Sequence, residues 1–348
     1  MRTNNFLSIY VPGLLGPLPG RVPPGAITRQ PALESWLAKG RKANIDWTAG
    51  SAPYGIGESY NIDDLLPPQQ SAAALAWLAD GGDPGSDCWA RVMPVCLSLE
   101  GPGARLLAVD LAENEIEQLY AAVAGFFESY GLSLMVSDSG RWFLKGAELP
   151  PGRTDPRHLP GGRVDYLIPR SPNNLAWSRI WTELEMLLFN QPVNMQRQER
   201  GLPPVNSLWI WGVGRCPQSP MQLPWGRVAS TCPEWRGWSL WAGGEAGDDA
   251  QHAVVCPNQP TLVHCSRAAE AISAEDWGGW LEAVEYVDSN LIGPALKLLR
   301  GRQSQRPGWS RLVLWVNARA APVVLEKAYL WRFWRRILPF ESWLIEES

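Results

Sequence analysis

The sequence predicts an α/β protein with a mostly parallel sheet and helices on both faces, interrupted by a small α+β domain. Short β-branched and aromatic runs alternate with helical periodicity along the chain. Clusters of Pro and Gly separate a central stretch from the rest. The 348 residues, 45% of them hydrophobic, suffice for a large core. We therefore expect core segments at 1–85 and 169–348 and an inserted domain at 86–168.

The first core segment contains one predicted strand and two predicted helices. Residues 6–11 form an apolar run that ends at Pro12-Gly13, which is typical of a buried strand followed by a loop. Residues 31–39 begin with Pro, place apolar side chains on one face and are followed by Gly40, which predicts a helix. Residues 71–79 predict a second helix, stopped by the Gly- and Pro-rich cluster 81–85.

The central stretch predicts paired strands around an amphipathic helix. The expected elements are, in order, strands 91–99 and 105–109, helix 113–129, and strands 132–136 and 141–144. The inward-facing residues of the helix should be Leu119, Val123 and either Phe126 or Phe127. The last core segment should contain, in order, helix 174–189, strand 208–211, helix 277–299, strand 311–316 and helix 326–337.

Charge is distributed unevenly along the chain. The formal net charge is −4, which excludes a chain that is basic throughout as nucleic-acid binders often are. Residues 295–336, however, hold ten basic residues and one acid. No apolar run reaches the about 18 to 20 residues that span a bilayer. Prolines interrupt the N-terminal apolar stretch before any cleavage site, so we expect a cytoplasmic protein.

The cysteines and histidines show no metal-binding pattern. The six cysteines contain no CxxC pair and the three histidines fall in no zinc spacing, so we predict reduced thiols, no metal and no cofactor. His252, Cys256 and His264-Cys265 are close in sequence but fit no known site. Of the 20 tryptophans, 15 lie after residue 174. They either fill the core or form an interaction or base-stacking surface.

Residues 191–217, QPVNMQRQERGLPPVNSLWIWGVGRCP, contain a candidate anion site. A polar, Arg-rich stretch precedes an apolar strand that ends in a Gly-x-Gly-Arg sequence. In open α/β sheets ligands bind after the carboxyl ends of strands, and Gly lets backbone N–H groups approach an anion. A turn with a solvated face is the alternative. The candidate ligand-binding residues are Asn194, Arg197, Arg200, Asn206, Gly212, Gly214 and Arg215.

This segment closely resembles the PVN, Arg, G-PPAN, strand, GAG pattern of the archaeal-type cofactor-independent phosphoglycerate mutases, which belong to the alkaline phosphatase superfamily. Weaker similarity covers most of the chain in order, at residues 7–13, 31–41, 71–78, 91–110, 141–158 and 281–323. The resemblance implies an alkaline-phosphatase-like core with an inserted domain. It also implies two divalent metals, held mainly by Asp and His, that activate a Ser or Thr nucleophile.

The positions that this resemblance assigns to catalysis have changed. Pro12 stands where the family has its first metal-binding Asp, and residues 317–321 read Asn-Ala-Arg-Ala-Ala in place of the Asp-His pair. Ser71, the weak nucleophile candidate, is one residue out of register and suits a helix N-cap. We interpret the chain as a degenerate, non-catalytic relative of these enzymes. Its candidate ligand is a phosphorylated or carboxylated small molecule. The alternative is a metal-dependent phosphotransferase or phosphatase with relocated ligands.

Similar bacterial proteins are labelled phosphoglycerate mutase-like or as a regulatory protein of a pathogenicity-factor cluster, which implies a regulatory or interaction role. The loop residues Asp46, Asp63 and Asp64 are candidates for surviving ligands, although Asp is also common in turns. His158 is expected in the exit loop of the inserted domain.

The basic C-terminal region is a candidate binding surface. On the predicted helix 326–337, Arg332, Arg335 and Arg336 share one face, while Leu330, Trp334 and Ile337 or Leu338 can face inward. Arginines next to Trp331 and Trp334 suit single-stranded nucleic acid or an acidic protein, bound through residues 295–336. The alternative is a docked helix with solvated arginines.

Overall fold

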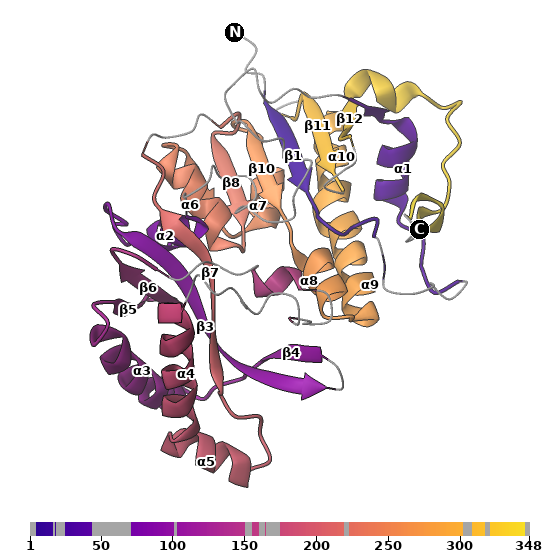
Figure 1. The fold of residues 1–348 in the computed structure, drawn as a ribbon. Coiled ribbons are helices and arrows are strands. Elements are labelled where there is room, and N and C mark those ends of the chain that lie inside the picture. Colours follow the sequence, from indigo (N-terminus) through magenta and orange to yellow (C-terminus); the bar gives the residue numbers. More distant parts are fainter. Residues whose placement is uncertain are drawn as a thin grey trace. The chain divides into compact units, whose positions relative to one another are not determined.

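The computed structural model describes residues 5–16, 18, 25–43, 71–100, 103–149, 155–159, 164, 175–218, 223–301, 308–316 and 321–344. The chain forms two compact units (Figure 1). The core unit comprises Met1–Pro67 and Ser219–Ser348, and the inserted unit comprises Pro68–Gln218. The predicted boundaries at 86 and 168 differ from these limits, because the helix at 72–79 and the strand at 207–215 pack within the inserted unit.

The core unit is built on a seven-stranded sheet in the order β2-β12-β11-β1-β10-β8-β9. The five strands from β11 to β9 run parallel, and β12 and β2 are antiparallel at one edge. This confirms the predicted mostly parallel sheet. The strands are β1 (Phe6–Tyr10), β2 (Arg41–Lys42), β8 (Arg227–Ser230), β9 (Glu245–Gly247), β10 (Thr261–His264), β11 (Arg311–Trp315) and β12 (Val323–Glu326).

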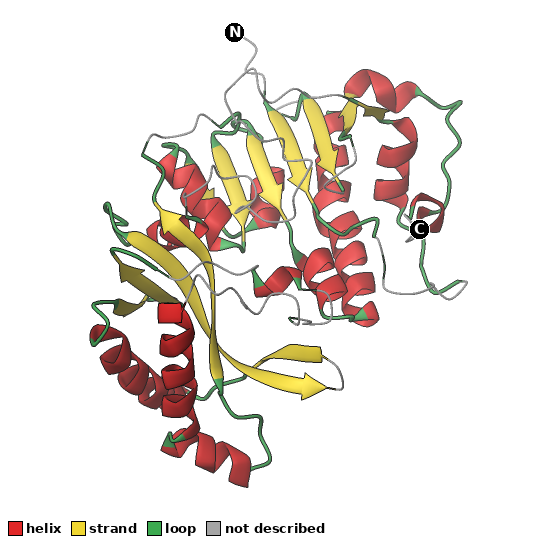
Figure 2. Ribbon diagram, in the orientation of Figure 1, coloured by secondary structure: helices red, strands yellow, loops and turns green. Residues whose placement is uncertain are grey.

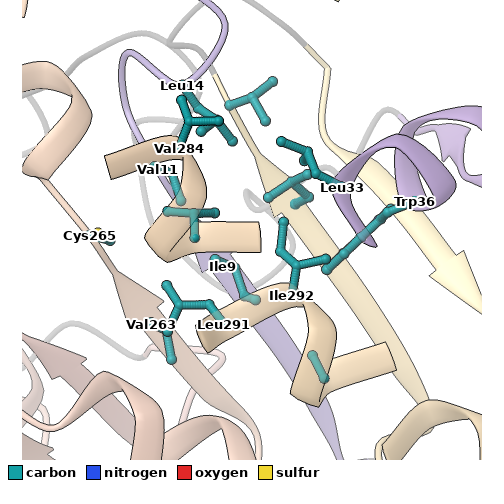
Figure 3. Packing of buried hydrophobic residues seen from close by; sticks show 14 of the residues in the cluster. Ile9, Val11, Leu14, Leu33, Trp36, Val263, Cys265, Val284, Leu291 and Ile292 are labelled. Carbon is teal, nitrogen blue, oxygen red and sulfur yellow. The ribbon is translucent and has the colours of Figure 1, made fainter. Parts of the chain in front are cut away.

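Helices cover both faces of this sheet, as predicted (Figure 2). Alternate residues of a strand point to opposite faces. Leu7 and Ile9 of β1 pack in the large apolar cluster, part of which Figure 3 shows, together with residues of α1, α7, α9 and α10. Tyr10, on the opposite face, contacts Trp235 of α6. The helices are α1 (Pro31–Lys39), α6 (Pro233–Trp241), α7 (Ala250–Val255), α8 (Arg267–Ser273), α9 (Trp277–Tyr286) and α10 (Gly293–Arg300).

The predicted helix 277–299 is interrupted by a π-helical stretch, Val287–Ile292. Pro294, which lacks a backbone N–H, follows this stretch in the first turn of α10. The buried carboxylate of Asp288 accepts a hydrogen bond of 2.6 Å from the backbone N–H of Leu33 in α1. The irregular turn thus ties the long helix to α1.

The inserted unit is an antiparallel sheet with helices α2 (Ala72–Ala79), α3 (Glu113–Glu128), α4 (Leu175–Phe189) and α5 (Pro192–Glu199). Its strands are β3 (Cys88–Glu100), β4 (Gly103–Ala108), β5 (Ser133–Val136), β6 (Trp142–Gly146) and β7 (Ser207–Arg215). The predicted strands and helices of 86–146 are confirmed. Helix α3 buries Leu119, Val123 and Phe127, as its periodicity predicts.

Strand β7 was expected in the core sheet, and this prediction was wrong. It pairs antiparallel with the 13-residue β3, whose other edge pairs with β6 and β4. Its apolar sequence, SLWIWGVGR, is explained by burial on both faces of the inserted sheet and not by a parallel sheet.

The predicted C-terminal helix 326–337 was also wrong. Residues 323–326 form β12, which pairs with β11 and β2, and two short 3₁₀ helices follow, Lys327–Trp331 and Phe340–Trp343. Arg332 then donates to the backbone carbonyl of Lys39 at 3.0 Å and its guanidinium lies 3.7 Å from the centre of the Tyr329 ring. These tertiary contacts override a helical propensity that is weak on its own. None of the described helices is long and apolar enough to cross a membrane.

Candidate functional site

The carboxyl end of the parallel sheet is the place where open α/β sheets bind ligands. Four neighbouring strands end there in one row. Ser230 of β8 is in register with His264 of β10, His264 with Tyr10 of β1, and Tyr10 with Trp315 of β11. All four side chains are buried. This row of strand ends, Ser230, His264, Tyr10 and Trp315, is the centre of the candidate site.

The row is closed by hydrogen bonds and aromatic contacts. The hydroxyl oxygen of Ser230 lies 2.9 Å from Nδ1 of His264 and accepts from the backbone N–H of Cys232 at 3.0 Å. The indole of Trp235 stacks on the imidazole of His264 with ring centres 5.1 Å apart. The Tyr10 ring lies 5.4 Å from the same imidazole. Packing of this kind leaves the His264 imidazole between two aromatic rings.

The loop after β1 is also tightly packed against neighbouring helices. Gly13 has a left-handed φ of 77°, and a Cβ added there would lie 3.0 Å from backbone atoms of Ala269 and 2.9 Å from the side chain of Ile272. The indole N–H of Trp280 donates to the carbonyl of Gly13 at 3.0 Å. The Gly that follows Pro12 is therefore explained by its close packing on α8.

Two buried thiols, those of Cys232 and Cys265, lie next to the row of strand ends. Burial raises the pKa of the Cys265 thiol. Cys232 is buried and its thiol lies 3.6 Å from the Ser266 hydroxyl, which donates to Glu270 at 2.6 Å. Each of these contacts joins one side chain of the edge to another.

Among the described residues, the side chains at the carboxyl end of the sheet do not fit the pair of metal ions that the family resemblance implies. Pro12 directly follows β1 and offers no ligand atom. Within the described ranges, no group of three or more His, Cys, Asp or Glu residues is arranged to hold a metal ion. The candidates Asp46, Asp63 and Asp64, and positions 317–320, lie outside the described residues.

The predicted ligand residues Asn194, Arg197 and Asn206 all bind other parts of the inserted unit. The Asn194 amide donates to the carbonyls of Leu188 and Val205 and accepts from the Val205 N–H, each at 2.7 Å. The Asn206 amide accepts from the N–H of Leu97 at 2.7 Å and donates to its carbonyl at 2.9 Å. These amides thus replace missing backbone partners.

Arg197 is almost fully buried and pairs with the carboxylate of Glu115 at 2.6 Å. It also donates to the carbonyls of Pro203 at 2.9 Å and Asp110 at 3.0 Å. Arg200 forms a second ion pair with Glu115. Burial alone would raise the pKa of Glu115, but the Ala112 N–H and the two guanidinium groups outweigh it and lower this pKa. The two arginines therefore neutralise an internal carboxylate.

The Gly-x-Gly sequence, which was predicted to lie in a loop after the strand, forms a β-bulge within β7. Trp89 is in register with Gly214 and Arg91 with Trp211, so Gly212 and Val213 together oppose one residue of β3. Gly212 has a left-handed φ of 65°, which favours Gly at such a bulge. Arg215 donates to the carbonyls of Ser86 and, at 3.3 Å, Ala147. Whether these residues also contact a ligand stays a prediction.

Ser71 is the N-cap of α2, the alternative that the sequence offered for this residue. Its fully buried hydroxyl accepts from the Ala74 N–H at 3.0 Å and donates to the Gly212 carbonyl at 2.5 Å. His158 lies in the short 3₁₀ helix Pro156–His158. The structure places Ser71 in the inserted unit and the row of strand ends in the core unit.

The residues predicted to bind a partner lie on the described C-terminal stretch but not on a common helical face. Trp331 and Trp334 are exposed, as are Arg335 and Arg336, whereas Arg332 is half-buried. Trp334 was expected to face inward and does not.

Comparison with known proteins identifies the family. No family model matches the sequence. A 2,3-bisphosphoglycerate-independent phosphoglycerate mutase of Methanosarcina mazei is 30% identical over 316 residues, which cover 77% of this chain and 74% of that protein. The chain belongs to the 2,3-bisphosphoglycerate-independent phosphoglycerate mutase family.

A second mutase of this name, from Methanothrix thermoacetophila, is 25% identical to the chain over 324 residues and covers 80% of it. A solved structure of a Pyrococcus horikoshii protein superposes with a TM-score of 0.51 at 16% identity and covers 92% of this chain and 86% of its own. That likeness shows a shared fold.

Sequence reasoning missed the row of strand ends. Residues 227–230 (RVAS) and 261–264 (TLVH) each place two apolar residues directly before a final polar residue, Ser230 or His264. That local signal was present. The register that brings these residues next to Tyr10 depends on pairing between strands far apart in sequence.

Proposed function

We propose that this chain is a non-catalytic member of the phosphoglycerate mutase family that acts as a regulatory or interaction protein. The observation that carries the proposal is the row of strand ends. At the carboxyl end of the parallel sheet, where open α/β folds bind ligands, Tyr10, His264 and Trp235 pack against one another. Pro12 occupies the position that resembles the family's first metal-binding Asp.

The chemistry of phosphoryl transfer supports this proposal. Divalent cations stabilise the charge that develops on the transferred phosphoryl group, and they commonly contribute several kcal/mol. Carboxylates and neutral imidazoles are the side chains that hold such ions. The row supplies no carboxylate and one imidazole, that of His264, which is buried between the rings of Tyr10 and Trp235. Ser71, the candidate nucleophile, has its buried hydroxyl engaged as a helix cap.

A regulatory or interaction role also suits other features of the chain. All six cysteines are free thiols, which is consistent with a cytoplasmic location. A retained phosphorylated or carboxylated ligand would bind without turnover. The fraction of protein that holds this ligand would then vary with the ligand's concentration, which is how a regulatory protein can respond to a metabolite.

The test is interconversion of 2- and 3-phosphoglycerate by purified protein with added manganese or zinc. The Methanosarcina mazei relative serves as the positive control. We expect no turnover above buffer from folded protein. Turnover that Ser71→Ala abolishes, with the folded state unchanged by circular dichroism, would instead support the phosphotransferase with relocated ligands.

A further inference from the structure

The segment from Trp331 to Ile337 presents large apolar side chains to solvent. The exposed fractions are 77% for Trp331, 87% for Phe333, 65% for Trp334 and 41% for Ile337. Phe333 and Trp334 contact each other edge to face, with ring centres 5.3 Å apart. Exposed apolar side chains that cluster in this way mark binding surfaces. We call residues 331–337 the aromatic strap.

The strap is anchored at both ends, so its exposure is a feature of the fold. At its start, Arg332 donates to the carbonyl of Lys39 at 3.0 Å, and the Lys39 ammonium donates to the carbonyl of Leu330 at 3.1 Å. After the strap, the ring of Phe340 is buried and stacks on Trp280. Its backbone N–H donates to the Glu34 carboxylate at 2.9 Å.

The strap and the residues directly beside it in the sequence carry positive charge. Residues 327–339 contain four basic residues and no acid. Arg335 and Arg336 are exposed within the strap. The exposed Arg41 and Lys42 of β2 pair with β12, the strand that leads into the 3₁₀ helix before the strap. The fold therefore adds cations from the N-terminal part of the chain to those of the basic C-terminal region.

We propose that the aromatic strap binds the surface of an anionic lipid bilayer. Trp and Phe side chains favour the interface between headgroups and acyl chains, and Arg and Lys beside them attract anionic lipids. Ile337 favours lipid over single-stranded nucleic acid, because an aliphatic side chain offers no ring on which a base stacks. The edge-to-face arrangement of Phe333 and Trp334 also differs from a set of parallel stacking platforms.

The experiment is co-sedimentation of the full-length protein with vesicles of phosphatidylcholine alone and of phosphatidylcholine mixed with phosphatidylserine. We expect binding to the anionic vesicles that weakens as salt is added. The double substitution Phe333→Ser/Trp334→Ser should weaken binding by at least about tenfold, because two aromatic side chains no longer insert. Arg335→Glu/Arg336→Glu should have a similar effect.

Two matched controls separate the strap from general surface effects. Phe189→Ser replaces another exposed aromatic residue, 75% exposed in the inserted unit, and should leave binding unchanged. Arg335→Lys/Arg336→Lys keeps the charges and should retain binding. Circular dichroism checks the fold of every variant.

Three results would overturn the proposal. They are failure of the wild-type protein to sediment with anionic vesicles, binding that survives both strap substitutions, and binding of an oligothymidylate through the strap without any binding to vesicles. The vesicle result does not depend on turnover of phosphoglycerate, so this proposal and the proposed function fail separately.

Discussion

Substitution of Asn194 tests most directly whether the family-like PVN segment stabilises the folded state of this chain. Its amide makes three buried hydrogen bonds of 2.7 Å, two to the carbonyls of Leu188 and Val205 and one from the Val205 N–H. These bonds tie the end of α4 to the chain that enters β7. Asn194→Ala removes all three partners and leaves those backbone groups buried without them.

The expected loss of stability follows from these three groups. Each buried backbone group that loses its partner costs about 1 to 3 kcal/mol. Partial relaxation and entry of water lower the sum, so we expect Asn194→Ala to reduce the free energy of unfolding by about 3 to 5 kcal/mol. The matched control is Asn190→Ala. Asn190 is exposed and makes one bond to the Met186 carbonyl, so its loss should stay within about 0.5 kcal/mol.

The assay is urea denaturation followed by tryptophan fluorescence and circular dichroism, with titration of 3-phosphoglycerate on the same preparations. A loss below about 1 kcal/mol in Asn194→Ala, comparable to the Asn190 control, would refute the structural role. If Asn194→Ala kept its stability and lost a measured affinity for 3-phosphoglycerate, the amide would act on a ligand instead.

Three further predictions concern a carboxylate, a glycine and a thiol. The pKa of Glu115 is lowered in the folded state, so its stabilising contribution is present above its ordinary pKa of about 4.3 and is lost as pH falls through the folded value. The stability difference between wild type and Glu115→Gln should therefore shrink below about pH 4.3 in urea titrations, and a difference independent of pH would contradict this. Gly212→Ala places a Cβ at a φ of 65° and should cost about 1 to 2 kcal/mol in the same assay, whereas Gly125→Ala, in the open surface of α3, should not destabilise. Burial, and to a smaller extent the nearby charge of Asp83, raises the pKa of the Cys216 thiol to about 11. Iodoacetamide at pH 8 should therefore modify Cys216 far more slowly than a free thiol of ordinary pKa. Equal modification rates in folded and unfolded protein would argue against this buried environment.

The elements that were predicted correctly are those whose ends are marked by Pro or Gly, or whose apolar residues recur with the period of a helix or a strand. Helix α1 has the predicted bounds because Pro31 starts it and Gly40 follows it. The inserted hairpin β3–β4 and helix α3 followed from alternation and from one apolar stripe. In these segments, local preference and tertiary packing agree.

The errors occur where long-range pairing decides the conformation. A helix was predicted over 326–337, but Glu326 ends β12, which pairs with β11 and β2. The Gly212 to Gly214 sequence suits both a loop and a β-bulge, and its register with β3 identifies the bulge, while its predicted contact with an anion stays a prediction. The row of Ser230, His264 and Tyr10 joins three distant segments. A single sequence contains no direct record of such pairing.

The proposal that this chain is non-catalytic requires that the carboxyl end of its parallel sheet holds no pair of divalent metal ions. Elemental analysis of the purified, folded protein after incubation with manganese and zinc and removal of excess ion tests it directly. The row of Ser230, His264, Tyr10 and Trp315 contains one imidazole and no carboxylate, so we expect no divalent metal at a stoichiometric level. Retention of one or two equivalents of manganese or zinc by the folded protein would contradict the claim.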